Sequence, residues 1–215
     1  MDWVRIIEIL ITSITSIIVA LVSAGFFRRM TEKQKSVESK NQLMEQIKKD
    51  EIVHLAIRDI RRRYNADRVY LWQFHNGGTF YTTSPMQRMS ITYERCSDGL
   101  ERKAERNQNH FITNFTSYIK DVMEGNMFYP DYKEIPDLGL RTLIHSNGTE
   151  SHAATAIYDR DKHLVAIVCL DWVFSKIPQD LLKKDGHFNE NFKEEFTRES
   201  NTLENFLNYV ENYVF

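Results

Sequence analysis

Three histidines lie next to or near sequences typical of turns, and histidine is suited to metal binding and to proton transfer near neutral pH. His75 precedes Asn76–Gly77–Gly78, His145 precedes Ser146–Asn147–Gly148, and His152 follows soon after. If the corresponding hairpins lie side by side, the three imidazoles could converge as metal ligands or as donors to an anionic ligand. In the competing interpretation, Asn-Gly is ordinary turn chemistry and the histidines are solvated neighbours. We predict no metal site, because no carboxylate stands at a recognisable ligand spacing.

Aromatic residues near these histidines could form the wall of a ligand pocket. The expected ligand-binding residues are His75, Asn76, Trp72, Tyr81, Tyr129, Arg141, His145 and His152. Aromatic residues on strands belong more often to the core, and the alternative interpretation of Trp72 is therefore that it is a core residue. Arg141 would either bind a ligand carboxylate or phosphate, or pair with Asp137. The identity of a ligand or cofactor stays unknown at this stage.

The sequence offers no motif of a known catalytic apparatus. There is no Gly-x-Ser-x-Gly nucleophile elbow and no glycine-rich phosphate loop, so we predict no catalytic residues. Cys96 and Cys169 are the only cysteines and lie far apart, which excludes a disulfide framework and a cysteine zinc site and favours a reducing compartment. An enzyme that uses the three histidines remains a minority alternative.

The elements that would position these residues begin with a β-hairpin. Residues 68–74 are β-branched and aromatic, Asn76–Gly77 is a typical two-residue turn, and residues 79–83 form a second strand-like run. Residues 89–93 could continue the sheet, with Pro85 at an edge or bulge. Apolar spacing predicts a helix over 111–123 that ends at Gly125, followed by a loop over 127–139 that could act as a lid.

The clearest strands lie in the second half of the chain. Residues 151–158 and 164–174 are predicted strands, joined by the polar turn of residues 159–162. Residues 164–170 are continuously apolar, which indicates a central strand covered on both faces. Apolar residues from Phe192 to Val214 recur at helical spacing and predict an amphipathic C-terminal helix.

The chain resembles a GAF domain in the order of its predicted elements, which is helix, hairpin, sheet, helix, irregular loop, hairpin and helix. The resemblance is concentrated in the stretch from Leu138–Gly139–Leu140–Arg141 to Trp172. The resemblance covers about residues 45–215 and implies an α+β, PAS-like fold with a central antiparallel sheet flanked by helices. It also implies a pocket between sheet and loops and a dimer bundle made by the flanking helices, here 41–63 and 190–214. The Asn-Lys…Phe-x-x-x-Asp-Glu signature of cyclic-nucleotide GAF domains is missing, and no cysteine is suitably placed for a bilin.

An uncharged segment precedes this domain. The nineteen residues from Ile9 to Phe27 carry no charge and approach the length that crosses a bilayer. Arg28, Arg29, Lys33 and Lys35 follow this segment and only Arg5 precedes it, so the positive-inside rule places the C-terminal part in the cytoplasm. Thr12, Ser16, Ala20 and Ala24 form a stripe of small side chains, which either mediates self-association or is simply tolerated in a membrane helix.

Between the predicted span and the domain, charge is segregated. Residues 28–63 hold eleven Lys or Arg against six Asp or Glu, and no Pro or Gly interrupts residues 30–66. This predicts a basic helical stalk that either transmits a conformational signal or rests against anionic lipid head groups. The predicted organisation is therefore an anchor at 1–29, a stalk at 30–63 and a GAF-like cytoplasmic domain at 64–215.

The function predicted from these features is that of a single-pass membrane protein with a sensory domain. It would bind a small ligand or a protein partner and act as a homodimer or higher oligomer. A net charge of −2 argues against nucleic acid as a partner. The alternative class is a non-catalytic, membrane-associated structural or interaction protein of viral or mobile-element origin, in which the pocket is filled.

Overall fold

The computed structural model describes residues 3, 39–79, 85–125 and 127–207, apart from the side chains of residues 76–86. The chain divides into two compact units, Met1–Lys48 and Lys49–Phe215. Within the described residues, the first helix runs over 39–63 and so contributes to both units. No helix in this part of the chain is both long and apolar enough to cross a membrane, and the predicted span at 9–27 lies outside it.

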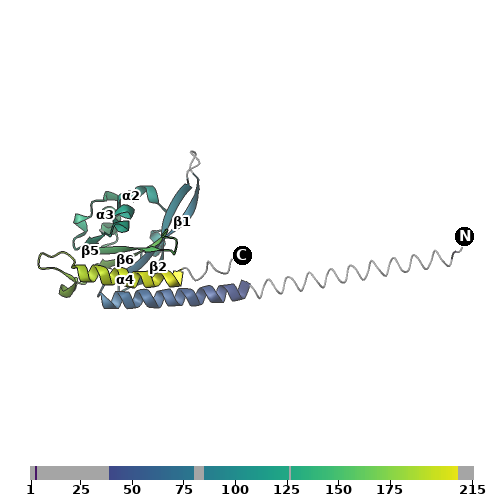
Figure 1. The fold of residues 1–215 in the computed structure, drawn as a ribbon, viewed down its shortest axis with the longest axis horizontal. Helices are drawn as coiled ribbons and strands as arrows, with labels where there is room; N and C mark the ends of the chain where they lie inside the picture. The colour runs from purple at the N-terminus through teal and green to yellow at the C-terminus, as the bar shows by residue number, and fades with distance from the viewer. Residues whose placement is uncertain (1–2, 4–38, 80–84, 126, 208–215) are drawn as a thin grey trace. The chain divides into compact units, whose positions relative to one another are not determined.

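The larger unit is built around one six-stranded antiparallel sheet (Figure 1). Its strands follow the spatial order β3-β2-β1-β6-β5-β4. Their bounds are β1 Arg68–Thr79, β2 Pro85–Cys96, β3 His110–Phe111, β4 Phe128–Tyr129, β5 Ser151–Tyr158 and β6 Leu164–Trp172. The strand predictions for 151–158 and 164–174 are confirmed, and β6 is the expected central strand, because it pairs with β1 and β5 and is buried from Ala166 onward.

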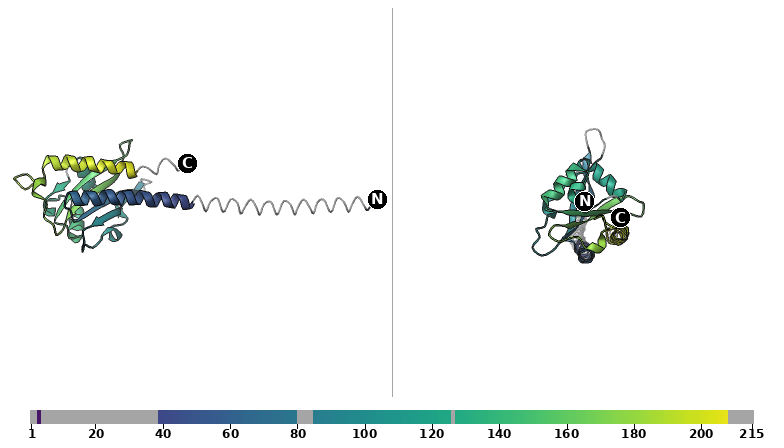
Figure 2. Two further views of the ribbon diagram at one scale, coloured as in Figure 1. Left: turned by 90° about the horizontal axis from the view of Figure 1, so that it is seen from below. Right: turned by 90° about the vertical axis from the view of Figure 1, so that its left-hand side faces the viewer.

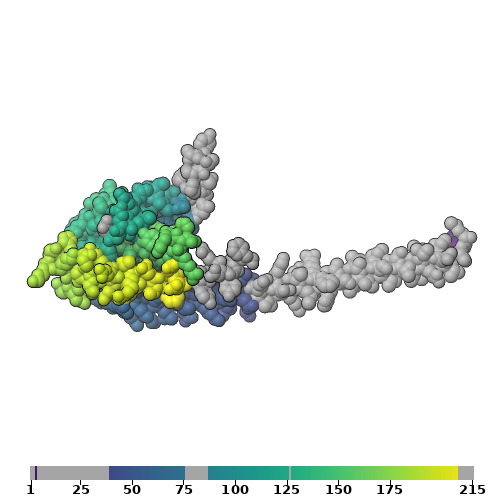
Figure 3. All heavy atoms as spheres, in the orientation of Figure 1, coloured from purple at the N-terminus to yellow at the C-terminus, as the bar shows by residue number. Residues whose placement is uncertain are grey.

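Two helices cover one face of this sheet (Figure 2). The first helix buries Val53, Ile57 and Ile60 on one side, at the spacing of successive helical turns. The helix α4, Glu190–Leu207, buries a matching row that includes Phe192, Phe196 and Leu203. The two helices run antiparallel side by side, because Lys49 Nζ donates to the carbonyl of Leu207 over 2.7 Å and Arg63 pairs with Glu199 (Figure 3).

Shorter elements cover the opposite face. They are α2 (Thr116–Met123), α3 (Leu138–Ser146) and the 3-10 turns η1 Ala104–Arg106, η2 Ile112–Asn114 and η3 Tyr132–Glu134. The turn η4 (Gln179–Leu181) follows the sheet and packs through Leu181 on the face of the first helix and α4. The carboxylate of Asp137 accepts from the backbone N–H of Leu140 over 2.9 Å and caps the start of α3. Beyond its end, Gly148 takes a positive φ of 77°, a conformation that glycine adopts without strain.

The predicted hairpin exists, but the position of its turn was wrong. Asn76 and Gly77 lie inside β1, where Asn76 pairs with Gln87 of β2, and the ladder continues to Thr79 opposite Pro85. The register shifts by one residue between these pairs, so the glycines are accommodated in a bulge instead of forming the turn. The predicted continuation of the sheet at 89–93 is confirmed as part of β2, and the predicted strand at 79–83 lies almost entirely outside the described residues.

Two predictions for the middle of the chain were only partly correct. The helix predicted over 111–123 begins at Thr116, because His110 and Phe111 pair with β2 as β3 and draw the preceding segment into the sheet. The loop predicted as a lid over 127–139 is instead fixed to the domain. Met127 and Ile135 are 0% and 1% exposed, and the edge strand β4 lies between them.

Candidate functional site

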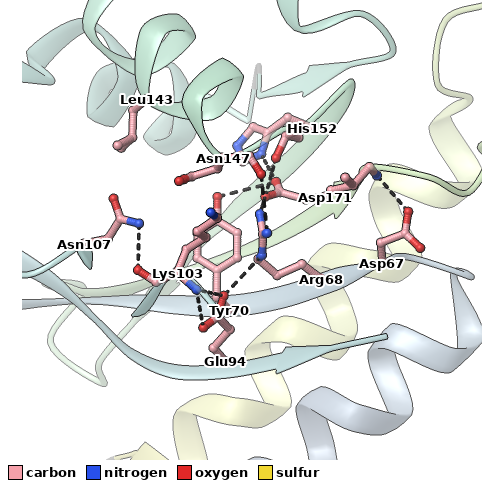
Figure 4. Close-up of polar contacts among 12 residues, drawn as sticks. Asp67, Arg68, Tyr70, Glu94, Lys103, Asn107, Leu143, Asn147, His152 and Asp171 are labelled. Carbon is pink, nitrogen blue, oxygen red and sulfur yellow. Dashed lines mark hydrogen bonds and ion pairs between the residues drawn. The ribbon is translucent and has the colours of Figure 1, made fainter. Parts of the chain in front are cut away.

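A row of charged and polar side chains crosses three neighbouring strands on the face covered by α2 and α3 (Figure 4). Arg68 of β1 and His152 of β5 are both direct cross-strand neighbours of Asp171 on β6. Strand side chains alternate between faces, so these three share their face with the buried Tyr70 and Cys169. None of the three charged or polar residues is more than 1% exposed.

Asp171 is the centre of this network. One of its carboxylate oxygens lies 2.8 Å from Nδ1 of His152 and also accepts from the hydroxyl of Tyr70 over 3.5 Å. The other oxygen accepts from the hydroxyl of Thr149 over 2.8 Å and from the guanidinium of Arg68 over 3.1 Å. Both oxygens are therefore fully supplied with donors, which is what a buried carboxylate requires.

Arg68 joins Asp171 to a second buried carboxylate, that of Glu94. The Nε atom of Arg68 lies 3.2 Å from Glu94, and the guanidinium also donates to the carbonyls of Glu101 and Asn147. Burial alone would lower the pKa of Arg68, but the carboxylate of Asp171 and the other nearby groups, Glu94 among them, together outweigh burial and the pKa is raised. Arg68 thus stays charged and ties β1 to the segments before η1 and after α3.

Glu94 holds the segment that follows β2. Its carboxylate accepts the backbone N–H groups of Lys103 and Ala104 over 3.0 and 2.9 Å, at the start of η1. The network therefore fixes the ends of the central strands together with the connections that leave them. Because its charged atoms are covered, the arrangement suits holding a conformation and offers no access to a substrate from solvent.

A third buried carboxylate, that of Asp67, secures the turn after β6. It accepts the backbone N–H groups of Val173, Phe174 and Ser175, each over 2.7 Å, and the Ser175 hydroxyl over 2.8 Å. Burial would raise the pKa of Asp67, but these hydrogen bonds outweigh burial and hold the pKa below its usual value. The turn carrying the exposed Phe174 is thereby rigidly attached to the start of β1.

The layer between the sheet and the helices α2 and α3 is filled by side chains. Trp72, Tyr118 and Met127 are each at most 1% exposed. The hydroxyl of Tyr118 lies 3.4 Å from the sulfur of Cys169, and burial raises the pKa of both groups well above their ordinary values. Among the described residues, this layer is a packed core in the place where the sequence predicted a pocket.

The structure places the predicted ligand-binding histidines in three different environments. His75 lies 2.9 Å from the hydroxyl of Ser90, His145 stacks on Tyr132 with ring centroids 4.9 Å apart, and His152 belongs to the buried network. In the part of the chain that the structure describes, they do not form a set with ligand atoms within 4.8 Å of one another. The hypothesis of a converging histidine cluster is not supported.

The other predicted site residues are also dispersed. Trp72 belongs to the core, Tyr129 is half-buried on β4, and Arg141 donates to the carbonyl of Lys133 over 3.4 Å. The alternative pairing of Arg141 with Asp137 is absent from the described contacts, because Asp137 caps α3. Tyr81 and the side chain of Asn76 lie outside the described part.

The charged members of the network, Arg68, Glu94 and Asp171, were missed in the sequence. The available signal was their position at the ends of apolar strands, in phase with core residues such as Tyr70 and Cys169. A charge at a strand end usually marks the point where the strand reaches solvent. The sequence pattern alone therefore did not separate a buried ion network from an ordinary strand terminus.

Comparisons with solved structures identify the fold as that of GAF domains. A far-red cyanobacteriochrome photoreceptor superposes with a TM-score of 0.56 at 12% identity, covering 85% of this chain and 98% of that one. The GAF region of a putative membrane protein from Geobacter sulfurreducens gives 0.53 at 13% identity, with 79% and 99% covered. The PixJ GAF domain of Thermosynechococcus elongatus gives 0.53 at 15% identity, with 79% and 92% covered. Protein-family models and curated protein sequences gave no match.

Proposed function

We propose that the chain is a membrane-anchored regulatory module of GAF-like fold, which self-associates through its first helix and exchanges its signal with a protein partner. The fold is the part supported by the comparisons, with GAF domains of photoreceptors and of a putative membrane protein among the similar structures. The membrane anchor rests on the uncharged segment at 9–27, and the homodimer rests on the surface of the first helix.

The observation that carries this proposal is a second apolar side on the first helix. In the larger unit, Ile52 and Leu55 are 44% and 42% exposed, although Val53 and Ile57 of the same helix are fully buried. In the smaller unit, Leu43, Met44 and Ile47 are also exposed. A helix that is apolar on two sides has a further surface to bury, and a second copy of the same helix would cover it.

The packed interior favours a protein partner over a small ligand. Small-molecule sites are typically clefts or cavities of about 300–1,000 Å³ that bury most of the ligand surface. Two hollows in the described part of the chain are open grooves, of about 500 Å³ on α2 and about 540 Å³ beside α4. A module that signals by contacts along its helices needs no enclosed cavity.

Self-association is tested with the full chain in lipid nanodiscs, where the mass of the protein component is measured. We expect a dimer for the unaltered chain and at least a tenfold weaker association for the double variant Ile52→Ser, Leu55→Ser, because it removes the apolar contact. The matched control is Met123→Ser, Leu138→Ser, which replaces exposed apolar residues of α2 and α3. A dimer that is equally stable in both double variants would refute the helix-mediated contact.

Membrane anchoring is tested by alkaline extraction of membranes from cells that express the full chain. The chain should remain in the membrane pellet, whereas a chain with Ile14, Ile18 and Leu21 all replaced by Arg should be released. Protease added to sealed spheroplasts should leave the C-terminal domain intact, because the basic residues after the span predict a cytoplasmic location. Extraction of the unaltered chain would contradict the anchor.

Binding of a small ligand is the second candidate, and one observation favours it. The indole N–H of Trp72 and the Nε2 atom of His152 lie on the same sheet face, and both are buried without a hydrogen-bond partner in the described structure. Unpaired buried polar groups are costly, and a small polar ligand would relieve that cost. The test is mass spectrometry of the compounds released when the purified full chain is denatured. A stoichiometric compound would favour this candidate, and its absence would favour the protein partner.

A further inference from the structure

The β1–β2 hairpin extends well past the strand that flanks it. β6 pairs with β1 only from Arg68 to Gln73, where Gln73 faces Ala166. The ladder between β1 and β2 continues to Thr79 opposite Pro85. Among the described residues, residues 74–79, which we call the β1 arm, therefore have a strand on one side only, and Figure 1 shows the hairpin running out beyond the rest of the sheet.

In the extended part of this hairpin, the strand edge without a neighbouring strand is mainly that of β1. On the other side, the short strand β3 pairs with β2 at Arg88 and Met89. At a rise of about 3.3 Å per residue, the β1 arm presents about 20 Å of free strand edge. Along such an edge, the backbone N–H and C=O groups of every second residue point outward and remain available for another strand.

Two of the devices that protect a free strand edge, charged side chains and proline, are missing from the β1 arm, whereas a third, a β-bulge, is present between Asn76 and Thr79. Proteins block exposed edges with charged side chains, with proline, with β-bulges or with a covering element. No Asp, Glu, Lys or Arg occurs between Arg68 and Arg88, and the β1 arm contains no proline. It does contain Gly77 and Gly78, and strand glycines permit the close approach of another backbone.

We propose that the β1 arm pairs edge to edge with the β1 arm of a second copy of this chain. Two identical edges that meet about a two-fold axis form an antiparallel ladder, and a two-fold contact is by nature self-complementary. An uncharged edge is well suited to this contact, because two copies bring no like charges together. The contact joins two hairpins into a four-stranded ribbon, whereas an isolated two-stranded hairpin is only marginally stable in water. This contact is separate from the contact through the first helix.

The direct test is amide hydrogen exchange of the full chain in detergent, measured at two protein concentrations a hundredfold apart. We expect backbone amides in the β1 arm to exchange at least tenfold more slowly at the higher concentration. Amides of β6, which are paired within the chain, should exchange equally at both. Exchange in the β1 arm that stays fast at both concentrations would overturn the proposal.

A charge placed on the arm provides the matched variant. Asn76→Lys introduces one positive charge into the β1 arm of each copy and should abolish the concentration-dependent protection. The control is Thr92→Lys, which adds the same charge at an exposed position of β2 inside the sheet. The double variant Ile52→Ser, Leu55→Ser should retain the protection, which separates this contact from the one through the first helix. If the amides were protected only in native membranes and never in the purified chain, the β1 arm would be pairing with a different protein. That result would refute pairing with a second copy of this chain.

Discussion

Each charge in the buried network is stable only because an opposite charge or a set of donors is supplied to it. Arg68 is 1% exposed and compensates two carboxylates, those of Asp171 and Glu94. Breaking a buried pair by removing one partner generally costs several kcal/mol, because the remaining charge is left uncompensated. Stability at this face of the sheet therefore depends strongly on one side chain.

We predict that Arg68→Met lowers the free energy of unfolding by about 3–5 kcal/mol. The measurement is chemical denaturation of the detergent-solubilised chain. The control is Arg106→Met, which removes an exposed arginine paired with the exposed Glu101 and should cost less than about 1 kcal/mol. Equal losses in the two variants would show that the network contributes little.

The carboxylate of Asp67 gives stability a specific dependence on pH. Its hydrogen bonds to residues 173–175 outweigh burial and lower its pKa in the folded protein, while in the unfolded chain the pKa is about 3.9. Because the pKa is lower in the folded state, the ionised Asp67 stabilises the folded protein fully above about pH 4. This stabilisation is lost as the pH falls through the pKa of the folded state. The difference in Tm between the unaltered chain and Asp67→Asn should be constant from pH 7 to about pH 5 and shrink at lower pH. A difference that grows on acidification would contradict this assignment.

The two cysteine thiols should be unreactive in the folded protein. Burial, followed by the nearby carboxylate of Glu94, raises the pKa of Cys96 to about 11, and burial raises the pKa of Cys169 well above the usual range. Because the thiolate is the reactive form, alkylation of Cys96 by iodoacetamide should speed up about tenfold per pH unit between pH 7 and 10. Cys169 should react only after denaturation, and rapid labelling of either thiol at pH 7 would be inconsistent with the structure.

At the level of elements, strongly patterned segments were predictable and the pairing between them was not. The continuous apolar run of β6 and the repeated aromatic spacing of α4 identified both elements, because each pattern fits a single kind of secondary structure. The Asn76–Gly77 sequence was misleading because turn residues are also tolerated in a bulged strand. The two-residue strands β3 and β4 have no periodicity of their own and exist only through their partners, β2 and β5.

Gly139 sets how closely α3 can approach the preceding segment. A Cβ atom at this position would lie 2.9 Å from the carbonyl oxygen of Asn114, which is a backbone atom with little freedom to move. We predict that Gly139→Ala destabilises the domain by about 1–3 kcal/mol through overpacking, measured by denaturation. Thr142→Ala, at an exposed position of the same helix, is the control and should change stability little. A Gly139→Ala variant as stable as this control would mean that α3 can shift freely.

For the molecule as a whole, the sequence predicted the fold class and the order of elements but not the state of the interior. Whether a GAF-like layer encloses a cavity depends on side chains such as Trp72, Tyr118 and Met127 meeting between the sheet and the helices that cover it, and no local pattern records such contacts. The histidine site could not be decided from local patterns for the same reason, since it required two hairpins to lie side by side. The membrane anchor is a property of the sequence alone and remains a prediction.

The central claim is that the chain acts as a dimer through its first helix, and disulfide trapping tests it most directly. Leu55→Cys would be introduced into the full chain with Cys96 and Cys169 replaced by Ser and Ala, and oxidised in native membranes. The account predicts an efficient disulfide-linked dimer, whereas Asn201→Cys, at an exposed position of α4, should stay monomeric under the same oxidation. Failure of Leu55→Cys to cross-link more than Asn201→Cys would contradict the claim.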